Sequence, residues 1–323
     1  MLSRQHGLGQ ETLHLPRYTP VKPRTLLFLI NRGCNLRCTF CDLWDNPQNI
    51  SLTDVGPILD DAVAIGTKIV VLTGGEPLMH PDIQSIIRMV KERGMVVNMT
   101  TNGLLLRRHW SWIRLSGIDS LSFSIDGLAE VHDKLRGQQG AYDLTMKAIQ
   151  TVLDESQIPC SVYCTVTNKN VHQLADLHQM FWQMGVGFDF WPVNDAPDLY
   201  LTSEEHKNLW VQAVEEIIER DVVYASRQSF YADSLRYHAG KVVDNRRCLG
   251  FVEQYGIKYN GDLLPCCVWE GERLVVGNVF ENPLKDLWHS EKVQGVRQSM
   301  VEDGCHVPCF NHSLYEFRTA VRG

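Results

Sequence analysis

The chain has 323 residues, of which 44% are hydrophobic and 21% charged, the composition of an ordinary globular protein with material for a large core. Its formal net charge of -7 argues against nucleic acid or an anionic membrane as the main partner. No apolar run near the N-terminus is long enough for a signal peptide or a transmembrane span, so we expect a cytosolic protein. We interpret its ten cysteines as ligands, catalytic thiols or core residues rather than disulfides.

The pattern along the chain predicts alternating strands and helices. Residues 1–23 are polar and proline-containing and predict an irregular arm, whereas residues 24–31 form an apolar run typical of a strand covered on both faces. Five further strands are predicted at 68–72, 95–100, 120–125, 160–166 and 187–193, and five helices at 53–65, 82–93, 105–115, 142–155 and 171–184. Six strands in alternation with helices predict a parallel sheet curved into all or part of a barrel, with its active site at the carboxyl ends of the strands.

Three cysteines, Cys34, Cys38 and Cys41, directly follow the first predicted strand. Three thiols can hold three irons of a [4Fe–4S] cluster and leave the fourth iron open, although three close cysteines can also form a zinc knuckle. The spacing CxxxCxxC, with Phe40 before the last cysteine, resembles the signature of the radical S-adenosylmethionine (SAM) enzymes. This resemblance implies that the open iron binds SAM and that one electron cleaves SAM to a 5′-deoxyadenosyl radical.

Short motifs follow the next three strands. The second strand ends in a GGEP segment, where paired glycines allow close approach and a carboxylate can hold an ammonium, although such a pair also makes a plain turn. The resemblance implies that this segment contacts the SAM amino group. It also implies that the ends of the third and fourth strands face the ribose and methionine parts of SAM. The Asn-Gly and Asp-Gly pairs at those two strand ends could alternatively be plain turns. The residues concerned are Gly74, Gly75, Glu76, Pro77, Thr101, Asn102, Ser124 and Asp126.

Three other features remain in the barrel region. Arg136 lies in a segment that looks like the family's, which implies contact with the SAM carboxylate, with a solvated surface arginine as the alternative. Cys160 and Cys164 share one face of the fifth strand, and we interpret them as structural. An aromatic ring, acids and an amide at the end of the sixth strand suit a polyhydroxylated or amine-bearing substrate, with loop capping as the alternative; they are Asp189, Trp191, Asn194 and Asp195.

Residues 202–221 predict an amphipathic helix, residues 255–269 a β-hairpin around Asn260-Gly261, and residues from Asn282-Pro283 to about 300 a helix. Five cysteines lie in this region, one before the hairpin, two on its return strand and two after the helix. Four ligands from separated elements can enclose a cluster, or a zinc ion, and the region resembles the auxiliary-cluster module of SPASM and twitch radical SAM enzymes. Five thiols are too few for two full auxiliary clusters, so we expect one, ligated by Cys248, Cys266, Cys305 and Cys309.

Cys267 is then left over. Because neighbouring residues on a strand point to opposite faces, Cys266 and Cys267 cannot easily serve the same cluster. One interpretation is that Cys267 returns a hydrogen atom to a substrate radical, as in the radical SAM epimerases of aminoglycoside and oligosaccharide antibiotic pathways that the chain resembles. The alternatives are that Cys267 is a buried structural residue, or that it is the ligand and Cys266 is spare.

The sequence therefore predicts an α/β protein, a partial (β/α)6 TIM-like barrel followed by a small α+β auxiliary-cluster module. Its expected divisions are an arm at 1–23, a radical SAM core at 24–200, a helical linker at 201–245 and the module at 246–323. The expected cofactors are SAM and two [4Fe–4S] clusters, and the expected partners are a small-molecule or glycosylated natural-product substrate and an electron donor such as flavodoxin or ferredoxin. The expected reaction is epimerisation at a carbinol carbon of a sugar or aminocyclitol. Dehydrogenation of the same substrates and maturation of a ribosomal peptide are alternatives, and a non-catalytic electron-transfer protein would have no use for an open iron.

Overall fold

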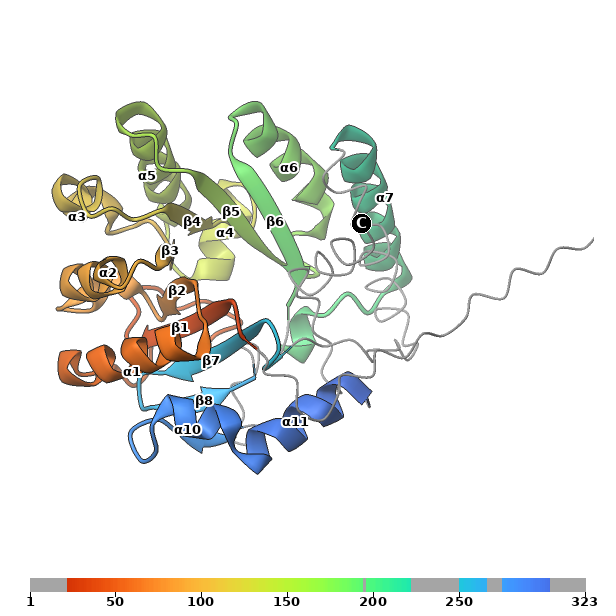
Figure 1. Cartoon of the computed structure of the whole chain (residues 1–323). Helices are drawn as coiled ribbons and strands as arrows, with labels where there is room; N and C mark the ends of the chain where they lie inside the picture. The colour runs from red at the N-terminus through yellow and green to blue at the C-terminus, as the bar shows by residue number, and fades with distance from the viewer. Residues whose placement is uncertain (1–21, 194–195, 222–249, 266–274, 303–323) are drawn as a thin grey trace, which may run out of the picture.

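The computed structural model describes residues 22–193, 196–221, 250–265 and 275–302. These residues form one nine-stranded sheet in the order β6-β5-β4-β3-β2-β1-β7-β8-β9, with helices around its outer face (Figure 1). The strands are β1 (Thr25–Asn31), β2 (Ile69–Gly74), β3 (Val96–Thr101), β4 (Ser120–Ser124), β5 (Cys160–Val166), β6 (Gly187–Pro192), β7 (Gln254–Lys258), β8 (Asp262–Leu264) and β9 (Gly277–Asn278).

The helices follow the strands in the predicted alternation. They are α1 (Leu52–Ile65), α2 (Ile83–Glu92), α3 (Leu106–Ile113), α4 (Ala129–Arg136), α5 (Ala141–Glu155), α6 (Leu174–Gln183), α7 (Glu204–Arg220), α10 (Leu284–His289) and α11 (Glu291–Glu302), with 3-10 turns at η1 (Pro77–Met79), η2 (Val171–Gln173) and η3 (Pro197–Leu199). Strands β1 to β6 pair in parallel in sequence order. The predicted partial barrel is therefore confirmed.

The two faces of the curved sheet differ in chemistry. On β1, the alternate residues Leu26, Phe28 and Ile30 are fully buried in the hydrophobic core beneath the helices. On β6, Phe188 and Phe190 contact rings of α6 and α7 in the same layer. Because successive side chains on a strand alternate between faces, the residues between them project from the inner face of the barrel.

The predicted C-terminal hairpin extends the barrel sheet. Strand β7 pairs in parallel with β1, and β8 returns antiparallel to β7. The hydroxyl of buried Tyr255 on β7 lies 2.9 Å from the Thr67 hydroxyl, and its ring packs on Trp288 of α10. Strand β1 is consequently covered along both edges, by β2 and by β7, as well as by the outer helices.

Two local expectations were wrong. Helix α4 was not predicted, and the single helix expected from Asn282-Pro283 is two helices, with Pro283 rather than Asn282 as the N-cap of the first. The break falls at Ser290, whose extended backbone ends α10 and whose hydroxyl accepts a hydrogen bond from the backbone N–H of Val293 in the first turn of α11. A serine that caps a helix in this way starts a new helical axis without a proline or a glycine.

Candidate active site

The motifs singled out in the sequence meet at the carboxyl edge of the parallel strands. The cluster loop, residues 32–45, leaves β1, and the GGEP segment, residues 74–77, leaves the neighbouring strand β2. The ends of β3 and β4 follow in order along the sheet. Parallel strands place their carboxyl ends side by side, so this clustering is a direct result of the fold.

The cluster loop and the GGEP segment touch backbone to backbone. The Gly75 N–H donates to the Asn31 carbonyl oxygen at 3.0 Å, and the Glu76 N–H donates to the Gly33 carbonyl oxygen at 2.7 Å. A Cβ atom on Gly75 would overlap the Gly33 carbonyl, and Gly74 adopts φ +136°, a conformation that L side chains rarely adopt. The glycine pair is required here because no side chain fits between the two segments.

The Glu76 carboxylate holds the end of β2 to the end of β3. It is fully buried and accepts hydrogen bonds from the Leu78 N–H at 3.1 Å, the Thr101 hydroxyl at 2.7 Å and the Asn102 N–H at 2.8 Å. Burial raises its pKa, and the three donors oppose this shift. Glu76, which the sequence suggested could hold an ammonium, therefore has three hydrogen-bond donors within the protein. Glu76 is also the N-cap of the 3-10 turn that begins at Pro77.

Two of the three loop thiols lie beside side-chain N–H donors. The Asn102 Nδ2 lies 3.8 Å from Cys34 Sγ, and the Arg136 Nη1 lies 3.8 Å from Cys38 Sγ. Burial raises the pKa of the Cys34 thiol to about 11 and also raises that of Cys38, although the Arg136 charge opposes the second shift. N–H donors close to sulfur stabilise the thiolate form and tune the potential of an iron-sulfur cluster, so these residues fit a cluster. The thiol of Cys41 is half-buried on the same loop.

Among the described residues, no three His, Cys, Asp or Glu side chains gather closely enough to chelate a single metal ion. In a cubane cluster each protein thiolate binds a different iron. The proposed ligands Cys34, Cys38 and Cys41 would thus each hold one corner of the cluster.

Arg136 is buried rather than solvated. Its Nε lies 2.5 Å from the Asp126 Oδ2, and its guanidinium stands 5.5 Å from the centre of the Phe40 ring. Asp126 is fully buried, and its other oxygen accepts the Thr165 N–H of β5 at 2.8 Å. The sequence assigned Arg136 to the SAM carboxylate; within the described residues its partners are Asp126 and Cys38.

Helix α4 ends against the cluster loop. The carbonyl oxygens of Leu135 and Arg136 accept the N–H groups of Thr39 at 2.8 Å and Arg37 at 3.3 Å. Gly137, in the left-handed conformation at φ +68°, lies so close to the Arg37 carbonyl that a Cβ atom would overlap it. The last carbonyl groups of a helix have no hydrogen-bond donor within the helix. Here the cluster loop supplies an N–H donor for the carbonyls of Leu135 and Arg136.

His132 of α4 supports the same region, and the sequence gave it no role. Its Nδ1 accepts the Asp126 N–H at 3.1 Å, and its Nε2 is buried without a hydrogen-bond partner. Burial, assisted by the Arg136 charge, lowers the pKa of His132 to about 4. The imidazole is therefore neutral at physiological pH, which keeps Nδ1 available as an acceptor.

This pKa predicts a pH dependence of stability. The pKa of a histidine in an unfolded chain is about 6.5. Between about pH 6.5 and about pH 4, this histidine is protonated in the unfolded chain but not in the folded chain. The free energy of unfolding should therefore fall as the pH drops from about 6.5 to about 4, by up to about 3 kcal/mol. Urea unfolding of the apoprotein across this range should show a smaller fall for His132→Asn, whose amide oxygen replaces Nδ1. Parallel curves for the two proteins would contradict the assignment.

The inner face of the barrel is polar. The hydroxyls of Ser122 and Ser161 lie 3.0 Å apart on β4 and β5. Two residues further along the strands, Ser124 pairs in register with Tyr163, and Tyr163 pairs with Asp189 of β6. Trp191, the next inner residue of β6, packs on the Tyr163 ring with centroids 5.0 Å apart. Hydroxyls, a carboxylate and an aromatic pair therefore line one wall of the barrel.

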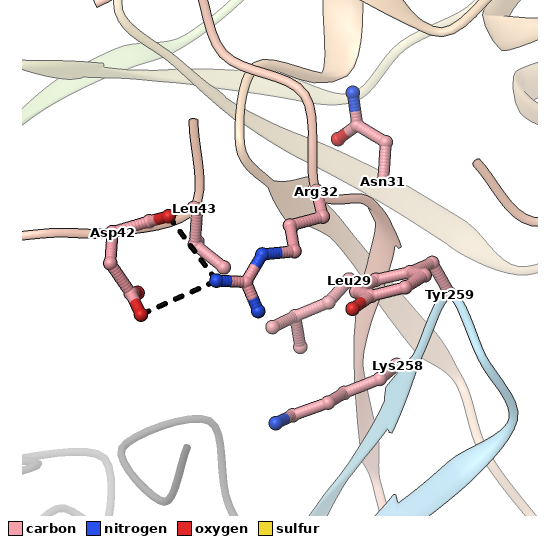
Figure 2. A pocket seen from close by; sticks show the side chains of 7 residues that line it. All are labelled: Leu29, Asn31, Arg32, Asp42, Leu43, Lys258 and Tyr259. Atoms are coloured by element: carbon pink, nitrogen blue, oxygen red, sulfur yellow. Dashed lines mark hydrogen bonds and ion pairs between the residues drawn. The ribbon is translucent and has the colours of Figure 1, made fainter. Parts of the chain in front are cut away.

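A small pocket lies where β7 meets the cluster loop. It has a volume of about 60 Å³ and is lined by polar and apolar residues (Figure 2), namely Asn31, Arg32, Asp42, Lys258, Tyr259, Leu29 and Leu43. The Arg32 guanidinium donates to Asp42 at 3.3 Å and to Asp45 at 2.9 Å, and so ties the start of the loop to its end. The sequence analysis gave no role to Arg32 or to Asn31 before it. Two polar residues at the end of an apolar strand are nevertheless a signal of a functional role.

Several predicted site residues lie outside the described residues, namely Asn194, Asp195, Cys248, Cys266, Cys267, Cys305 and Cys309. Of the two cysteines interpreted as structural, Cys164 is buried in the core and Cys160 is half-buried. No helix among the described segments has the length and apolar character needed to cross a membrane.

Comparison with known proteins identifies both parts of the chain. The model of the radical SAM superfamily matches residues 28–181, and that of the SPASM iron-sulfur cluster-binding domain matches residues 248–311. An AdoMet-dependent heme synthase of Methanosarcina barkeri is 26% identical over 296 residues, covering 84% of this chain and 83% of that protein. A probable GTP 3',8-cyclase of Methanococcus maripaludis is 24% identical over 274 residues, covering 80% and 90%.

Solved structures share the fold. SuiB of Streptococcus suis bound to S-adenosylmethionine superposes with a TM-score of 0.66 at 20% identity, covering 85% of this chain and 68% of that chain. The enzyme anSMEcpe with bound AdoMet and a peptide gives a TM-score of 0.66 at 16% identity, covering 88% and 86%. Residues 28–181 are therefore a radical SAM domain and residues 248–311 a SPASM iron-sulfur cluster-binding domain, and the cofactors are SAM and [4Fe–4S] clusters that include an auxiliary one.

Proposed function

We propose that the chain is a radical SAM epimerase that inverts a carbinol carbon of a sugar-containing or aminocyclitol-containing natural product. The feature that supports this substrate class is the polar inner wall of the barrel. Hydroxyls of Ser122 and Ser161 and the Asp189 carboxylate can exchange hydrogen bonds with substrate hydroxyls, while the paired rings of Tyr163 and Trp191 offer an apolar surface to C–H groups.

The proposed cofactor residues divide into two groups. Cys34, Cys38 and Cys41 hold the SAM-binding cluster, and Cys248, Cys266, Cys305 and Cys309 hold the auxiliary one. SAM bound at the first cluster supplies the 5′-deoxyadenosyl radical. The GGEP segment and the ends of β3 and β4 lie at the same edge of the sheet as the cluster loop, from which they can contact SAM through backbone carbonyls and polar side chains.

Cys267 completes the proposed reaction. After a hydrogen atom is lost from the carbinol carbon, the Cys267 thiol would give one back from the opposite face, which would leave a thiyl radical on Cys267. One electron and one proton then restore the thiol. A turnover thus consumes one electron for SAM cleavage and one for Cys267, and a low-potential donor such as flavodoxin or ferredoxin can supply both.

Turnover in deuterated water tests this proposal. The Cys267 thiol exchanges its hydrogen with solvent, so the epimer should be one mass unit heavier than the substrate. A dehydrogenase, in which the auxiliary cluster accepts the second electron, would instead give an unlabelled product two mass units lighter.

Paired cysteine variants identify the donor. Cys267→Ala should still release 5′-deoxyadenosine but should form no epimer, whereas Cys266→Ala should lose iron from the auxiliary cluster. Loss of iron in Cys267→Ala, with inversion retained in Cys266→Ala, would exchange the two roles. Inversion at the unchanged rate in both variants would remove the thiol donor from the mechanism.

A tetrapyrrole is the second candidate substrate. Heme synthases of Methanosarcina barkeri and Oleidesulfovibrio alaskensis align with 84% and 90% of the chain, which extends beyond the core common to the superfamily. Incubation of the reduced enzyme and SAM with an iron porphyrin, followed by mass spectrometry, separates the two candidates. A ribosomal-peptide maturase, the third alternative, should release 5′-deoxyadenosine only when a precursor peptide is supplied.

A further inference from the structure

We infer that Asn31 is a positioning residue that sets the cluster loop against the GGEP segment, and thereby the cluster against SAM. Asn31 ends β1, is fully buried, and lies three residues before Cys34. The inference rests on the proposed assignment of these two segments to the cluster and to SAM.

The carboxamide of Asn31 bridges the two segments. Its Nδ2 donates to the Glu76 carbonyl oxygen at 2.8 Å and to the Gly33 carbonyl oxygen at 3.3 Å. The same Gly33 oxygen accepts the Glu76 N–H, so the Asn31 side chain and the backbone of Gly33 and Glu76 form a closed set of hydrogen bonds. Asn31 also lines the Arg32 pocket, and Figure 2 shows its carboxamide pointing away from the Arg32 guanidinium.

The orientation of this carboxamide is fixed by its partners. Both groups that face Nδ2 are carbonyl oxygens, which can only accept, so a flipped amide would set oxygen against oxygen. The other end, Oδ1, is buried and has no hydrogen-bond partner among the described residues, which is unfavourable for a buried acceptor. An apolar side chain would avoid that cost but could not join the two segments.

The geometry leaves little tolerance for a shift. A Cβ atom on Gly74 would lie 2.7 Å from the Asn31 Oδ1, and one on Gly75 would overlap the Gly33 carbonyl. The two segments are therefore in direct backbone contact, and Asn31 supplies the side-chain hydrogen bonds between them. If they separate, a cluster held by one and SAM held by the other lose their register, even if both segments remain folded.

The test compares Asn31→Asp with a matched control, Asn168→Asp. Asn168 has the same bonding pattern, because its Nδ2 donates to the carbonyl oxygens of Asp198 and Tyr200 and its Oδ1 is buried without a partner. It joins the loop after β5 to η3, outside the two segments. Ionised aspartate keeps the shape of either side chain but loses the donor, so the control reports the effect of losing a two-carbonyl donor outside the two segments, at a site that is less buried than Asn31.

The first measurement needs no cofactor. Hydrogen–deuterium exchange of the apoprotein should show the Gly75 and Glu76 amides exchanging about tenfold or more faster in Asn31→Asp, and within about twofold of wild type in Asn168→Asp. Unchanged exchange at these amides in Asn31→Asp would overturn the inference. Asn31→Ser, whose donor is too short to reach both carbonyls, makes the same comparison if the aspartate variant does not fold.

The second measurement is the dissociation constant of SAM from the reconstituted, reduced enzyme, taken from the change that SAM causes in the cluster EPR spectrum. Asn31→Asp should bind SAM about tenfold more weakly, with its iron content unchanged. Wild-type affinity in that variant would also overturn the inference. Failure of the wild-type protein to bind SAM would instead refute the assignment of the two segments, and the exchange result would still decide whether Asn31 holds them together.

Discussion

Replacing Gly75 with alanine should reduce formation of 5′-deoxyadenosine by about a hundredfold or more, because the added methyl group has no space. Its Cβ would overlap the Gly33 carbonyl oxygen, a backbone atom that cannot rotate away as a side chain could. Forcing the two segments apart would also weaken the hydrogen bonds from the Gly75 and Glu76 amides. Anaerobic assay of the reconstituted variant by liquid chromatography measures the loss directly.

Gly33→Ala is the matched control for this prediction. A Cβ atom on Gly33 would meet only the Pro47 side chain at 3.6 Å, an ordinary contact, although Gly33 is the residue that Gly75 touches. SAM cleavage in Gly33→Ala should therefore remain within a few-fold of wild type. Equal activities for the two variants would show that the backbone contact described above does not limit the reaction.

Replacing Arg136 with methionine should destabilise the folded chain by about 3–5 kcal/mol, because it leaves the buried Asp126 charge without its partner. Asp126 is fully buried, and the Arg136 guanidinium is the only cation that the described residues place in an ion pair with it. Urea unfolding of the apoprotein at neutral pH measures the change. The variant should also be harder to reconstitute with iron, since the Arg136 N–H directed at Cys38 is lost with the charge.

The double variant Asp126→Asn/Arg136→Met separates the ion pair from the loss of side-chain volume. Removing both charges abolishes the unpaired carboxylate, so the double variant should recover much of the stability that Arg136→Met loses. The asparagine oxygen can still accept the Thr165 N–H. A double variant that is less stable than either single variant would place the main contribution of these residues in packing rather than in charge.

The alternation of elements was predictable because short strand-like segments, of which β1 is a continuous apolar run, alternate with longer segments that carry an apolar stripe at helical spacing. Most strand and helix bounds from the sequence differ from the structure by one or two residues. Helix α4 escaped prediction because its short sequence is polar, and its stability comes from contacts at its end, where its last carbonyls bind the cluster loop. Local patterns do not contain such tertiary contacts.

At the site, the sequence predicted which segments meet but not how their side chains are used. Glu76 and Arg136 were assigned to SAM by resemblance. The structure instead gives Glu76 three donors, one in the turn that follows it and two at the end of β3, and gives Arg136 a buried carboxylate. Asn31 and His132 were not singled out. Asn31 donates to the Glu76 carbonyl of a segment distant in sequence, and His132 accepts from the Asp126 N–H six residues before it. Both partners are backbone groups, and a backbone partner leaves no mark in the residue pattern.

The pairing of β7 with β1 restricts where this chain could be divided. A fragment that stopped before Gln254 would expose one whole edge of β1, a long apolar strand with unsatisfied N–H and C=O groups of the kind that recruits other chains into aggregates. A chimera that exchanges the C-terminal region for that of another enzyme should therefore place its junction after Leu264, so that the native hairpin stays with the native barrel.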